Sequence, residues 1–525
     1  QRLLDIARET VCGLKEDHSV KPDAEQLRLL ADGVFNKPYY QRGYKKGTVH
    51  IDKKLPLMDC FAAPCIEACP AHQKAPQYIR ALAQHKPEQG LAIIYKDNPL
   101  PNITGILCDH QCMYACARND YEGPIEIRDI KHRCALQAEI KPKAKVPVID
   151  KGKTAVIGSG PAGLACAHYL ALNGYPVTVF EQSAHIGGVP SEIIPKFRIS
   201  KESLHKDIDR IKTLGALFVT NAKPSYDDLK AQGFTSIVLA GGASVSKPFQ
   251  IKHCTIPVIT ALELLRTLHL EREKTRSFME QYQDASSIIV VGGGNTAMDA
   301  ARIAARLPWR PEVSIAYRRT KEEMPADKEE LEAAFADGVK LLELSLPEAV
   351  IEKERPYVVI RKMLLGKPGA DGRRTPYPSD ITELKPCDLI ISAIGEEPDT
   401  SLLDHFQVAH DYGRPLCDPE TMMSRSNESV FVVGDLRRGP SSIIAAEADG
   451  KRAAFAILRI AGIEPIDTLT CIQEEQPDIE AVRRKRGMYI PGTDLRDSNF
   501  VITEAQRCLS CDALCLRCVE TCPNR

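Results

Sequence analysis

The stretch that decides the fold is Thr154–Gln182, TAVIGSGPAGLACAHYLALNGYPVTVFEQ. A short apolar run precedes Gly158, Gly160 and Gly163, an Ala- and Leu-rich segment follows them, and a second apolar run ends at Glu181. Strand, glycine turn, helix, strand and acid in this order predict a dinucleotide-binding unit, with phosphates at the helix N-terminus and a ribose at the acid. A glycine-rich turn without a ligand is the weaker alternative, because all the parts of the unit are present.

Composition sets broad limits on the protein. The 525 residues are enough for about two to four domains, and the net charge of −1 gives no electrostatic case for nucleic acid or an anionic membrane. Of 18 cysteines, seven lie between Cys60 and Cys134 and five between Cys508 and Cys522. This clustering predicts metal sites in a reducing compartment, and hence a cytoplasmic protein, rather than a disulfide framework.

A second unit of the same kind lies inside the first. Ser287–Val291 is a predicted strand, Gly292–Ala297 is a glycine turn, and a helical segment leads to the strand Val313–Tyr317. That strand ends on Arg318 and Arg319, whose charge and paired hydrogen bonds suit a 2′-phosphate. The pair favours NADPH over NADH, with a solvated strand end as the alternative.

The first unit is completed far along the chain. Val430–Val433 is a predicted strand ending at Gly434-Asp435, and Ser442 precedes a helix over Ile443–Ile460. The acid can bind ribityl or phosphate-proximal hydroxyls, and the helix N-terminus can face a flavin carbonyl. The predicted fold class is therefore α/β, with two nested, doubly wound Rossmann-like domains.

Seven motifs in order carry a family resemblance: GSGPAG with Glu181, IGGV, IPKFRIS, GGGNTAMD, YRRTKEEMP, AIGEEP and VVGDLRRGPSSIIAAEADGKRAA. Together they resemble the NADPH:FAD module of the glutamate synthase small subunit, which with its iron–sulfur lead-in also forms the N-terminal half of dihydropyrimidine dehydrogenase. The likeness covers residues 55–465. With its C-terminal cysteines the chain looks most like the iron–sulfur flavoprotein subunit assigned in bacteria to a selenate reductase.

The resemblance implies FAD at the first unit, NADPH at the second and 4Fe–4S clusters nearby. No Cys-x-x-Cys occurs between 244 and 394, so a bound flavin would have no dithiol there to reduce. We expect no catalytic acid or base on the protein. The positions implied for FAD are Gly158, Ser159, Gly160, Pro161, Ala162, Gly163, Glu181, Gly188, Val189, Arg198, Gly434, Asp435, Ser442 and Ile443; those for NADPH are Gly292, Gly294, Asn295, Thr296, Arg318, Arg319, Lys328, Ala393, Ile394 and Gly395.

The predicted domains follow from the motifs and the resemblance. They are a helical lead-in at 1–50, an α-helical iron–sulfur domain at 51–148, an FAD-binding domain at 149–243 and 395–465, an NADPH-binding domain at 244–394 inserted in it, and a C-terminal, ferredoxin-like iron–sulfur segment at 466–525.

The first cysteine set is Cys60-x4-Cys65-x3-Cys69, Cys108-x3-Cys112-x3-Cys116 and Cys134. Soft, closely spaced thiolates favour iron–sulfur clusters, and zinc is the weaker alternative. The resemblance implies two 4Fe–4S clusters, one on Cys60, Cys65, Cys116 and an unidentified ligand, the other on Cys69, Cys108 and Cys112 with Cys134 as its candidate fourth. The family has a further cysteine where Leu57 stands here. Its Gln or Glu ligand falls on Lys131, which cannot ligate while protonated.

The second set is Cys508-x2-Cys511-x3-Cys515-x2-Cys518-x3-Cys522-Pro523, similar to a bacterial ferredoxin run. Four of these cysteines could hold a third 4Fe–4S cluster. We also expect the chain to be a piece of a longer protein, because it starts at Gln1 and stops soon after Pro523.

The sequence thus predicts an NAD(P)H-dependent FAD and iron–sulfur oxidoreductase that serves other redox subunits or domains, such as a molybdenum enzyme or a dihydropyrimidine-dehydrogenase-like domain. The alternatives are a glutamate-synthase small-subunit type and a non-catalytic electron-relay or scaffold subunit.

Overall fold

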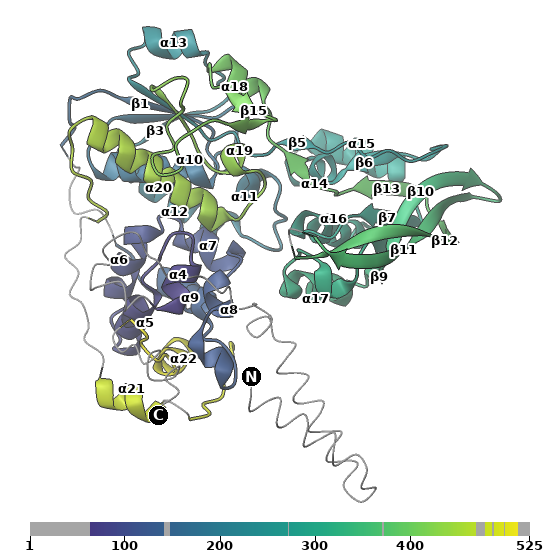
Figure 1. The fold of residues 1–525 in the computed structure, drawn as a ribbon, viewed down its shortest axis with the longest axis horizontal. Coiled ribbons are helices and arrows are strands. Elements are labelled where there is room, and N and C mark those ends of the chain that lie inside the picture. The colour runs from purple at the N-terminus through teal and green to yellow at the C-terminus, as the bar shows by residue number, and fades with distance from the viewer. Residues whose placement is uncertain are drawn as a thin grey trace, which may run out of the picture. The chain divides into compact units, whose positions relative to one another are not determined.

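The computed structural model (Figure 1) describes residues 63–140, 147–270, 272–369, 372–468, 478–485, 488–497 and 499–512. Residues Ala63–Leu514 form one compact unit. The predicted lead-in at 1–50 and Cys60, Cys515, Cys518 and Cys522 lie outside the described residues. None of the helices in the described ranges is long and apolar enough to span a bilayer.

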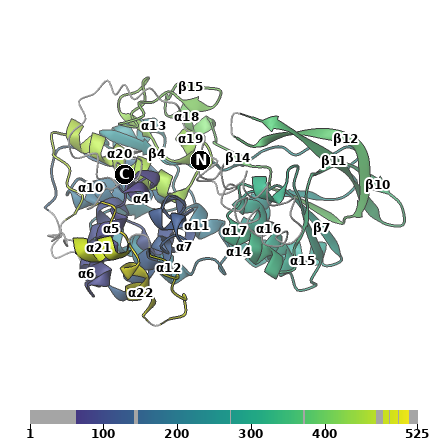
Figure 2. The ribbon, with the colours of Figure 1, turned by 60° about the horizontal axis from the view of Figure 1, so that its bottom comes forward.

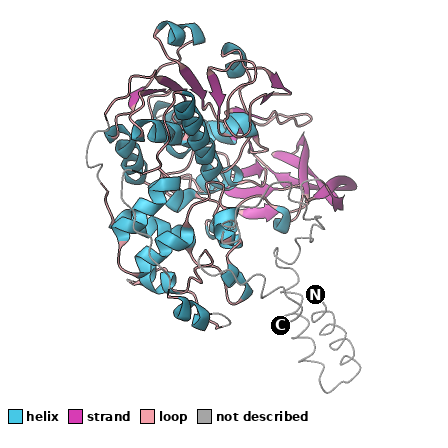
Figure 3. Cartoon of the chain, turned by 60° about the vertical axis from the view of Figure 1, so that its left-hand side comes forward, coloured by secondary structure: helices cyan, strands magenta, loops and turns pink. Residues whose placement is uncertain are grey.

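The first part of the chain is helical. Tyr78, Ile79 and Leu82 of one helix pack with Ile94 and Ile130 of two others in a single apolar core, and Figure 3 shows helices without strands in this part. Helical periodicity in the sequence predicts helices at Gln77–Gln84 and Pro87–Tyr95. The structure confirms them as α5 and α6, each with a proline in its first turn, where the missing N–H is harmless. The elements are α4 (Pro64–Ala68), α5 (Ala75–Ala83), α6 (Pro87–Asp97), α7 (Pro101–Leu107), α8 (Gln111–Tyr114), η2 (Ala117–Asp120) and α9 (Ile127–Gln137).

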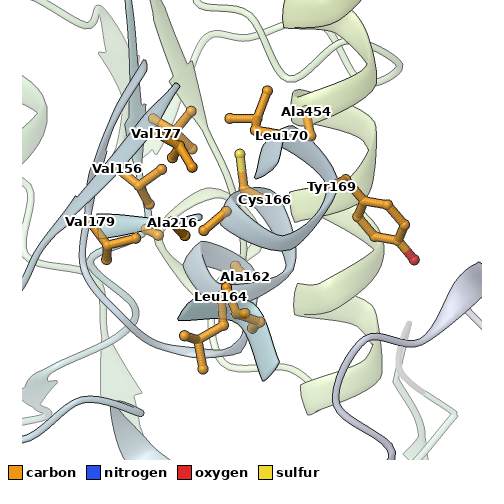
Figure 4. Packing of buried hydrophobic residues seen from close by; sticks show 14 of the residues in the cluster. Val156, Ala162, Leu164, Cys166, Tyr169, Leu170, Val177, Val179, Ala216 and Ala454 are labelled. Carbon is orange, nitrogen blue, oxygen red and sulfur yellow. The ribbon is translucent and has the colours of Figure 1, made fainter. Parts of the chain in front are cut away.

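The first nucleotide domain is built on a parallel sheet of order β17-β4-β1-β2-β3. The inner strands β1 and β4 are apolar and almost fully buried, as expected where helices cover both faces of a parallel sheet, whereas the edge strand β3 is largely exposed. In Figure 4, Val156, Val177 and Val179 of the strands lie beside α10, whereas Tyr169 points to the side of α20. The elements are β1 (Thr154–Ile157), α10 (Pro161–Leu172), β2 (Val177–Phe180), α11 (Val189–Glu192), α12 (Lys201–Thr213), β3 (Leu217–Val219), α13 (Tyr226–Ala231), β4 (Ser236–Leu239), α18 (Ser401–His405), β15 (His410–Asp411), β16 (Arg414–Pro415), β17 (Val430–Val432), α19 (Asp435–Arg438) and α20 (Ile443–Ile460).

The second nucleotide domain is inserted in the first and has its own parallel sheet, of order β6-β13-β7-β8-β9. A separate antiparallel sheet, β10-β11-β12, stands beside it (Figure 2). Of its strands, only the middle one can be predicted from the sequence, by the apolar run Val358–Ile360. The chain enters and leaves this domain through the paired strands β5 and β14. The elements are β5 (Val245–Ser246), β6 (Val258–Thr260), α14 (Ala261–Leu270), α15 (Arg272–Tyr282), β7 (Ser287–Val291), α16 (Asn295–Ala305), β8 (Glu312–Ala316), η3 (Lys321–Glu323), α17 (Lys328–Ala336), β9 (Lys340–Leu342), β10 (Ser345–Glu352), β11 (Pro356–Pro368), β12 (Arg374–Pro386), β13 (Leu389–Ser392) and β14 (Glu396–Glu397).

Helices α10 and α20 approach each other unusually closely. A Cβ on Gly450 of α20 would stand 2.2 Å from the carbonyl oxygen of Ala162, and one on Gly434 would stand 2.9 Å from the Ala162 Cβ. Only glycine fits such a backbone approach. This contact brings the N-terminus of α20 to the first glycine turn.

The C-terminal segment, with α21 (Ile479–Lys485) and α22 (Phe500–Gln506), packs on the helical part of the chain, α22 lying beside α5 and α9. A buried ion network fixes it there. The Arg507 guanidinium, 3% exposed, pairs with Glu122 at 3.0 Å and with Glu504, and Glu122 also pairs with Arg118 at 2.5 Å. Glu504 in turn accepts hydrogen bonds from the backbone N–H groups of Glu126 and Thr493. Each buried charge therefore has partners, as burial requires.

Replacing Arg507 by leucine should release this segment. Glu122 and Glu504 would keep their buried charges without the guanidinium between them, a loss of about 3–5 kcal/mol for a broken buried pair. Hydrogen–deuterium exchange at the α22 amides should accelerate by about 100-fold or more. Arg496→Leu is the matched control, since Arg496 is 91% exposed and pairs only with the nearby Asp494 in the described residues. Equal exchange rates in the two variants would contradict the role given to the buried ion network.

Candidate functional site

The first glycine turn is shaped to receive a pyrophosphate. Gly158 has a φ of +105°, and a Cβ there would stand 2.5 Å from the carbonyl oxygen of Ala240. A Cβ on Gly163 would stand 2.1 Å from the Gly158 oxygen. A Cβ on Gly160, by contrast, would meet nothing within 4 Å. The turn and the helix force glycine at two positions, and the third opens onto the space that a phosphate needs.

Glu181 ties this turn to the following loop. Its buried carboxylate accepts hydrogen bonds from the Ser159 N–H (2.9 Å), the Ser159 hydroxyl (2.7 Å) and the Ser183 N–H (2.9 Å). The Ser159 oxygen in turn accepts from the Gly187 N–H at 3.0 Å. A Cβ on Gly188, next to Val189 at the start of α11, would stand 2.8 Å from the Gly160 Cα. The GSGPAG and IGGV motifs therefore form one cradle.

The late part of the first unit reaches the same cradle. Gly434 lies against Ala162, which follows Pro161 in the first turn of α10. Burial raises the pKa of Asp435, although its carboxylate accepts a hydrogen bond from the Ser441 hydroxyl at 2.5 Å. Ser442 caps α20 by accepting from the Ala445 N–H at 3.3 Å, and Ile443 is the first residue of that helix. These are the late positions at which the family resemblance predicts flavin contacts, and the structure brings them to the first cradle.

The second glycine turn repeats the geometry. A Cβ on Gly292 would stand 2.2 Å from the carbonyl oxygen of Ala393, at the Ala393-Ile394-Gly395 loop, whereas a Cβ on Gly294 would meet nothing within 4 Å. Asn295 accepts a hydrogen bond from the Asp327 N–H at 2.8 Å, which holds the start of α17, and thus the exposed Lys328, beside the turn. Thr296 is a hydrogen-bond partner of the Glu396 carboxyl.

The two arginines after β8 have different surroundings. Arg318 is exposed beside the second cradle, whereas Arg319 is 8% exposed and its Nε donates to the carbonyl of Arg374 at 2.7 Å. From the sequence, both arginines were predicted to bind the 2′-phosphate. The structure leaves Arg318 as the one of the two that is open to a phosphate.

Arg198, predicted at the FAD site, is engaged elsewhere. Its guanidinium bonds Asp299 of α16 and Glu330 of α17, each at 2.8 Å, and is 12% exposed. Burial raises the pKa of Asp299 to about 6, with Arg198 opposing the rise. The contacts of Arg198 thus join the two nucleotide domains, a role that its motif position did not indicate.

The cysteines of the helical part surround two adjoining cavities. The first cavity is lined by Cys69, Cys108 and Cys112, together with Gln73, His110 and the buried Lys131. Gln73 donates to the Cys69 sulfur at 3.5 Å, and the sulfur of Cys108 accepts from the His110 N–H. The His110 Nε2 lies 3.0 Å from the Asp327 carboxylate, while its Nδ1 is buried without a hydrogen-bond partner among the described residues. Sequence reasoning missed both Gln73, which follows Cys69 by four residues, and His110, which lies between Cys108 and Cys112.

The second cavity lies between two segments that are far apart in the sequence. It is lined by Cys65 and Cys116 from the helical part and by Cys508 and Cys511 from the C-terminal segment. Cys116 accepts hydrogen bonds from the N–H groups of Ile125 and Arg118, and Cys508 accepts from the Ser510 N–H at 3.4 Å. Cys65 lines both cavities, so they are neighbours.

Cys134, our candidate fourth ligand of one cluster, lines neither cavity. Its Sγ donates to the carbonyl of Pro87 at 3.3 Å and packs near Gly90 and Leu82 in the helical core. Cys134 lies about one helical turn after Lys131 in α9, but its thiol faces the helical core, whereas Lys131 lines the first cavity. Its contacts are those of a buried structural thiol.

Burial makes these cavities unfavourable for thiolates without a cation. Burial and the nearby thiols of Cys508 and Cys116 raise the pKa of Cys65 well above its usual value, and burial raises those of Cys108 and Cys508 to about 11. A metal centre reverses this preference and holds thiols deprotonated. Among the described residues no three Cys, His, Asp or Glu side chains gather as a site for one ion; the thiolates of a cubane stand farther apart, around its corners.

Comparison with known proteins agrees with this geometry. Residues 152–450 match the family model of pyridine nucleotide-disulphide oxidoreductases. The chain belongs to this family. Residues 45–142 match the model of dihydropyrimidine dehydrogenase domain II, a 4Fe–4S cluster domain. The family and this domain confirm the predicted oxidoreductase class, with FAD, NADPH and 4Fe–4S groups as its cofactors.

Relatives extend over most of the chain. It is 39% identical over 516 residues to YgfK of Escherichia coli (strain K12), covering 96% of this chain and 48% of YgfK. It is 33% identical to the NADPH-Fe(3+) oxidoreductase subunit beta of Geobacter sulfurreducens, covering 77% and 64%, and 26% identical to the Escherichia coli glutamate synthase [NADPH] small chain, covering 76% and 89%. The chain therefore spans about half the length of YgfK.

Among solved structures, Mycobacterium tuberculosis FprA in complex with NADPH shares the fold, with a TM-score of 0.50 at 16% identity over 59% of this chain and 85% of FprA.

Two glycine substitutions in the first turn should separate cofactor binding from folding. Gly160→Ala adds a methyl group to open space, so the chain should fold with native circular dichroism yet lose most bound FAD. Gly163→Ala places a methyl group 2.1 Å from a carbonyl and should lose both fold and FAD. Retention of full FAD by Gly160→Ala would contradict the assignment of this cradle to the pyrophosphate.

Proposed function

We propose that the chain is an electron-transfer module that links NADPH to two iron–sulfur clusters and, through them, to a further redox subunit or domain. FAD, when bound, supplies the conversion between two-electron hydride chemistry and single-electron transfer. The observation that carries the proposal is the position of Ile444. This residue belongs to the first turn of α20, at the flavin cradle, and it also packs against Cys69 and Cys108 of the first cavity.

Shared residues among the described part of the chain support the proposed link between the three sites. The first turn of α20 borders the flavin cradle, Ile444 borders the first cavity, and Cys65 borders both the first cavity and the second. Each neighbouring pair thus shares a residue or a helical turn. This arrangement supports an electron path from the flavin cradle through the first cavity to the second.

The nicotinamide domain is connected to the same path. Arg198 joins it to the flavin domain through Asp299, and His110 of the first cavity faces Asp327 at the start of α17. These contacts orient the second cradle relative to the first. The chain's own residues therefore supply binding and orientation.

The partner is proposed from the relatives. Subunits named NADPH-Fe(3+) oxidoreductase beta and NADP(+)-dependent formate dehydrogenase beta share 33% and 32% identity with this chain. Since both are subunits of larger redox enzymes, we assign this chain to an assembly in which another subunit or domain exchanges electrons with a substrate.

Anaerobic titration with NADPH tests the proposal directly. The flavin absorbance should bleach as NADPH is added, and bleaching should be followed by reduction of the clusters. Absence of bleaching in a chain that holds FAD and iron would favour a relay that does not use its nicotinamide domain.

Arg318→Ala tests the nicotinamide site. Loss of its charged hydrogen bonds to the 2′-phosphate, worth about 1.5–3 kcal/mol, should raise the KM for NADPH by about 10- to 100-fold and leave that for NADH unchanged. Arg276→Ala on α15 is the matched control, because Arg276 is 84% exposed and pairs only with Glu280 in the described residues. Equal weakening of NADPH and NADH would contradict the assigned contact.

A further inference from the structure

The second cavity is the feature that the sequence did not predict. Cys65 lies in α4, Cys116 precedes η2, and Cys508 and Cys511 follow α22. In the sequence, the first pair belongs to the N-terminal set, for which one cluster ligand was left unidentified, and the second pair belongs to a run similar to a ferredoxin motif. In the fold the two pairs face one cavity.

Specific contacts hold the C-terminal pair at this place. On one side of Cys508, Arg507 forms the buried ion pairs with Glu122 and Glu504. Beyond Cys511, Asp512 receives two hydrogen bonds from the Arg80 guanidinium, at 2.5 and 2.8 Å, across 432 positions of the chain. Both residues of each contact are 11% exposed or less. The Cys508–Cys511 loop is thus anchored at both ends on the helical part.

The loop itself has the geometry of a sulfur ligand loop. Ser510 adopts a φ of +47°, in the left-handed region, and its N–H points to the Cys508 sulfur. His110 has the same left-handed backbone, φ +39°, within the cysteine loop of the first cavity, where its N–H bonds the Cys108 sulfur. Backbone amides directed at sulfur stabilise thiolate charge and tune cluster potential.

From this geometry we infer that Cys65, Cys116, Cys508 and Cys511 together ligate one 4Fe–4S cluster. The C-terminal segment then completes an N-terminal cluster, and Cys508 and Cys511 do not belong to a separate ferredoxin-like cluster. The inference rests on the proposed function only in assuming that the cysteines hold iron–sulfur clusters. Four thiolates complete the coordination of a cubane, so neither Cys60 nor Cys515 is needed at this site.

Iron stoichiometry of the 525-residue chain tests whether the two pairs share a cluster. Cys65→Ala and Cys508→Ala, each reconstituted anaerobically with iron and sulfide, should each lose about 4 Fe per chain, and the double variant should also lose only about 4 Fe. A loss of about 8 Fe in the double variant would place the two residues in different clusters and overturn the inference. Cys254→Ser, at an exposed cysteine of the nicotinamide domain, controls for handling.

Two further variants test the competing ligand sets. Cys60→Ala and Cys515→Ala should both keep the full iron content. A loss of about 4 Fe from Cys60→Ala would favour the ligand set of the resembling family, and the same loss from Cys515→Ala would favour a ferredoxin-like run. Either loss would overturn the assignment.

A spectroscopic readout covers the case in which an alanine variant folds poorly. In Cys508→Ser and Cys511→Ser the hydroxyl oxygen can replace the thiolate, so the electron paramagnetic resonance spectrum of the reduced cluster should shift, while Cys515→Ser leaves it unchanged. An unshifted spectrum in both of the first two variants would overturn the inference. FAD content and bleaching by NADPH should remain native in all of them, which separates failure of this inference from failure of the proposed function.

Discussion

The close packing of α20 on α10 is the constraint on which the rest of the site depends. Because Gly450 has no side chain, the α20 backbone can approach the Ala162 carbonyl, and the N-terminus of α20 then lies at the flavin cradle. Asp449, fully buried beside Gly450, accepts the Gly434 N–H and pairs with Arg437 and Arg438, which fixes the strand end that carries Asp435. The contact between α10 and α20 therefore positions both the first turn of α10 and the strand end at Gly434, which together form the first cradle.

The same helix links the flavin domain to the helical part. Ile444, near its start, packs on Cys69 and Cys108, and Lys451 bonds Asp97 of α6 at 2.8 Å. Glu447 lies between these residues on α20, fully buried, and burial raises its pKa well above its usual value. One helix thus contacts both the first cradle and the first cavity, and its first turn sets the spacing between them. Substitution in α20 would thus alter cofactor binding and cluster packing together.

Features encoded within short stretches could be predicted from the sequence. The two glycine turns, the strands beside them and helices α5 and α6 follow from local spacing, because backbone sterics decide them within a few residues. Arg198 and Cys134 show where this fails. Their motif positions gave a role by analogy, but their actual contacts, with Asp299 and with the Pro87 carbonyl, are set by how separate elements pack. Arg319 differs from Arg318 for the same reason.

The sequence left one ligand of an N-terminal cluster unidentified, and spacing alone could not show that the C-terminal cysteines lie beside Cys65 and Cys116. The position of Cys508 beside the second cavity depends on the ion pair of Arg507 with Glu122, two residues that are 385 positions apart in the chain. Buried charges that far apart in the chain are stabilised only when both segments are docked, and thiolates that share a cluster add the free energy of metal binding to the same docking. Cluster assembly and docking of the C-terminal segment are therefore coupled. Loading the second cavity with iron should slow amide exchange in α22, in the opposite direction to Arg507→Leu, and exchange that is independent of iron loading would show that the ion network holds the segment alone.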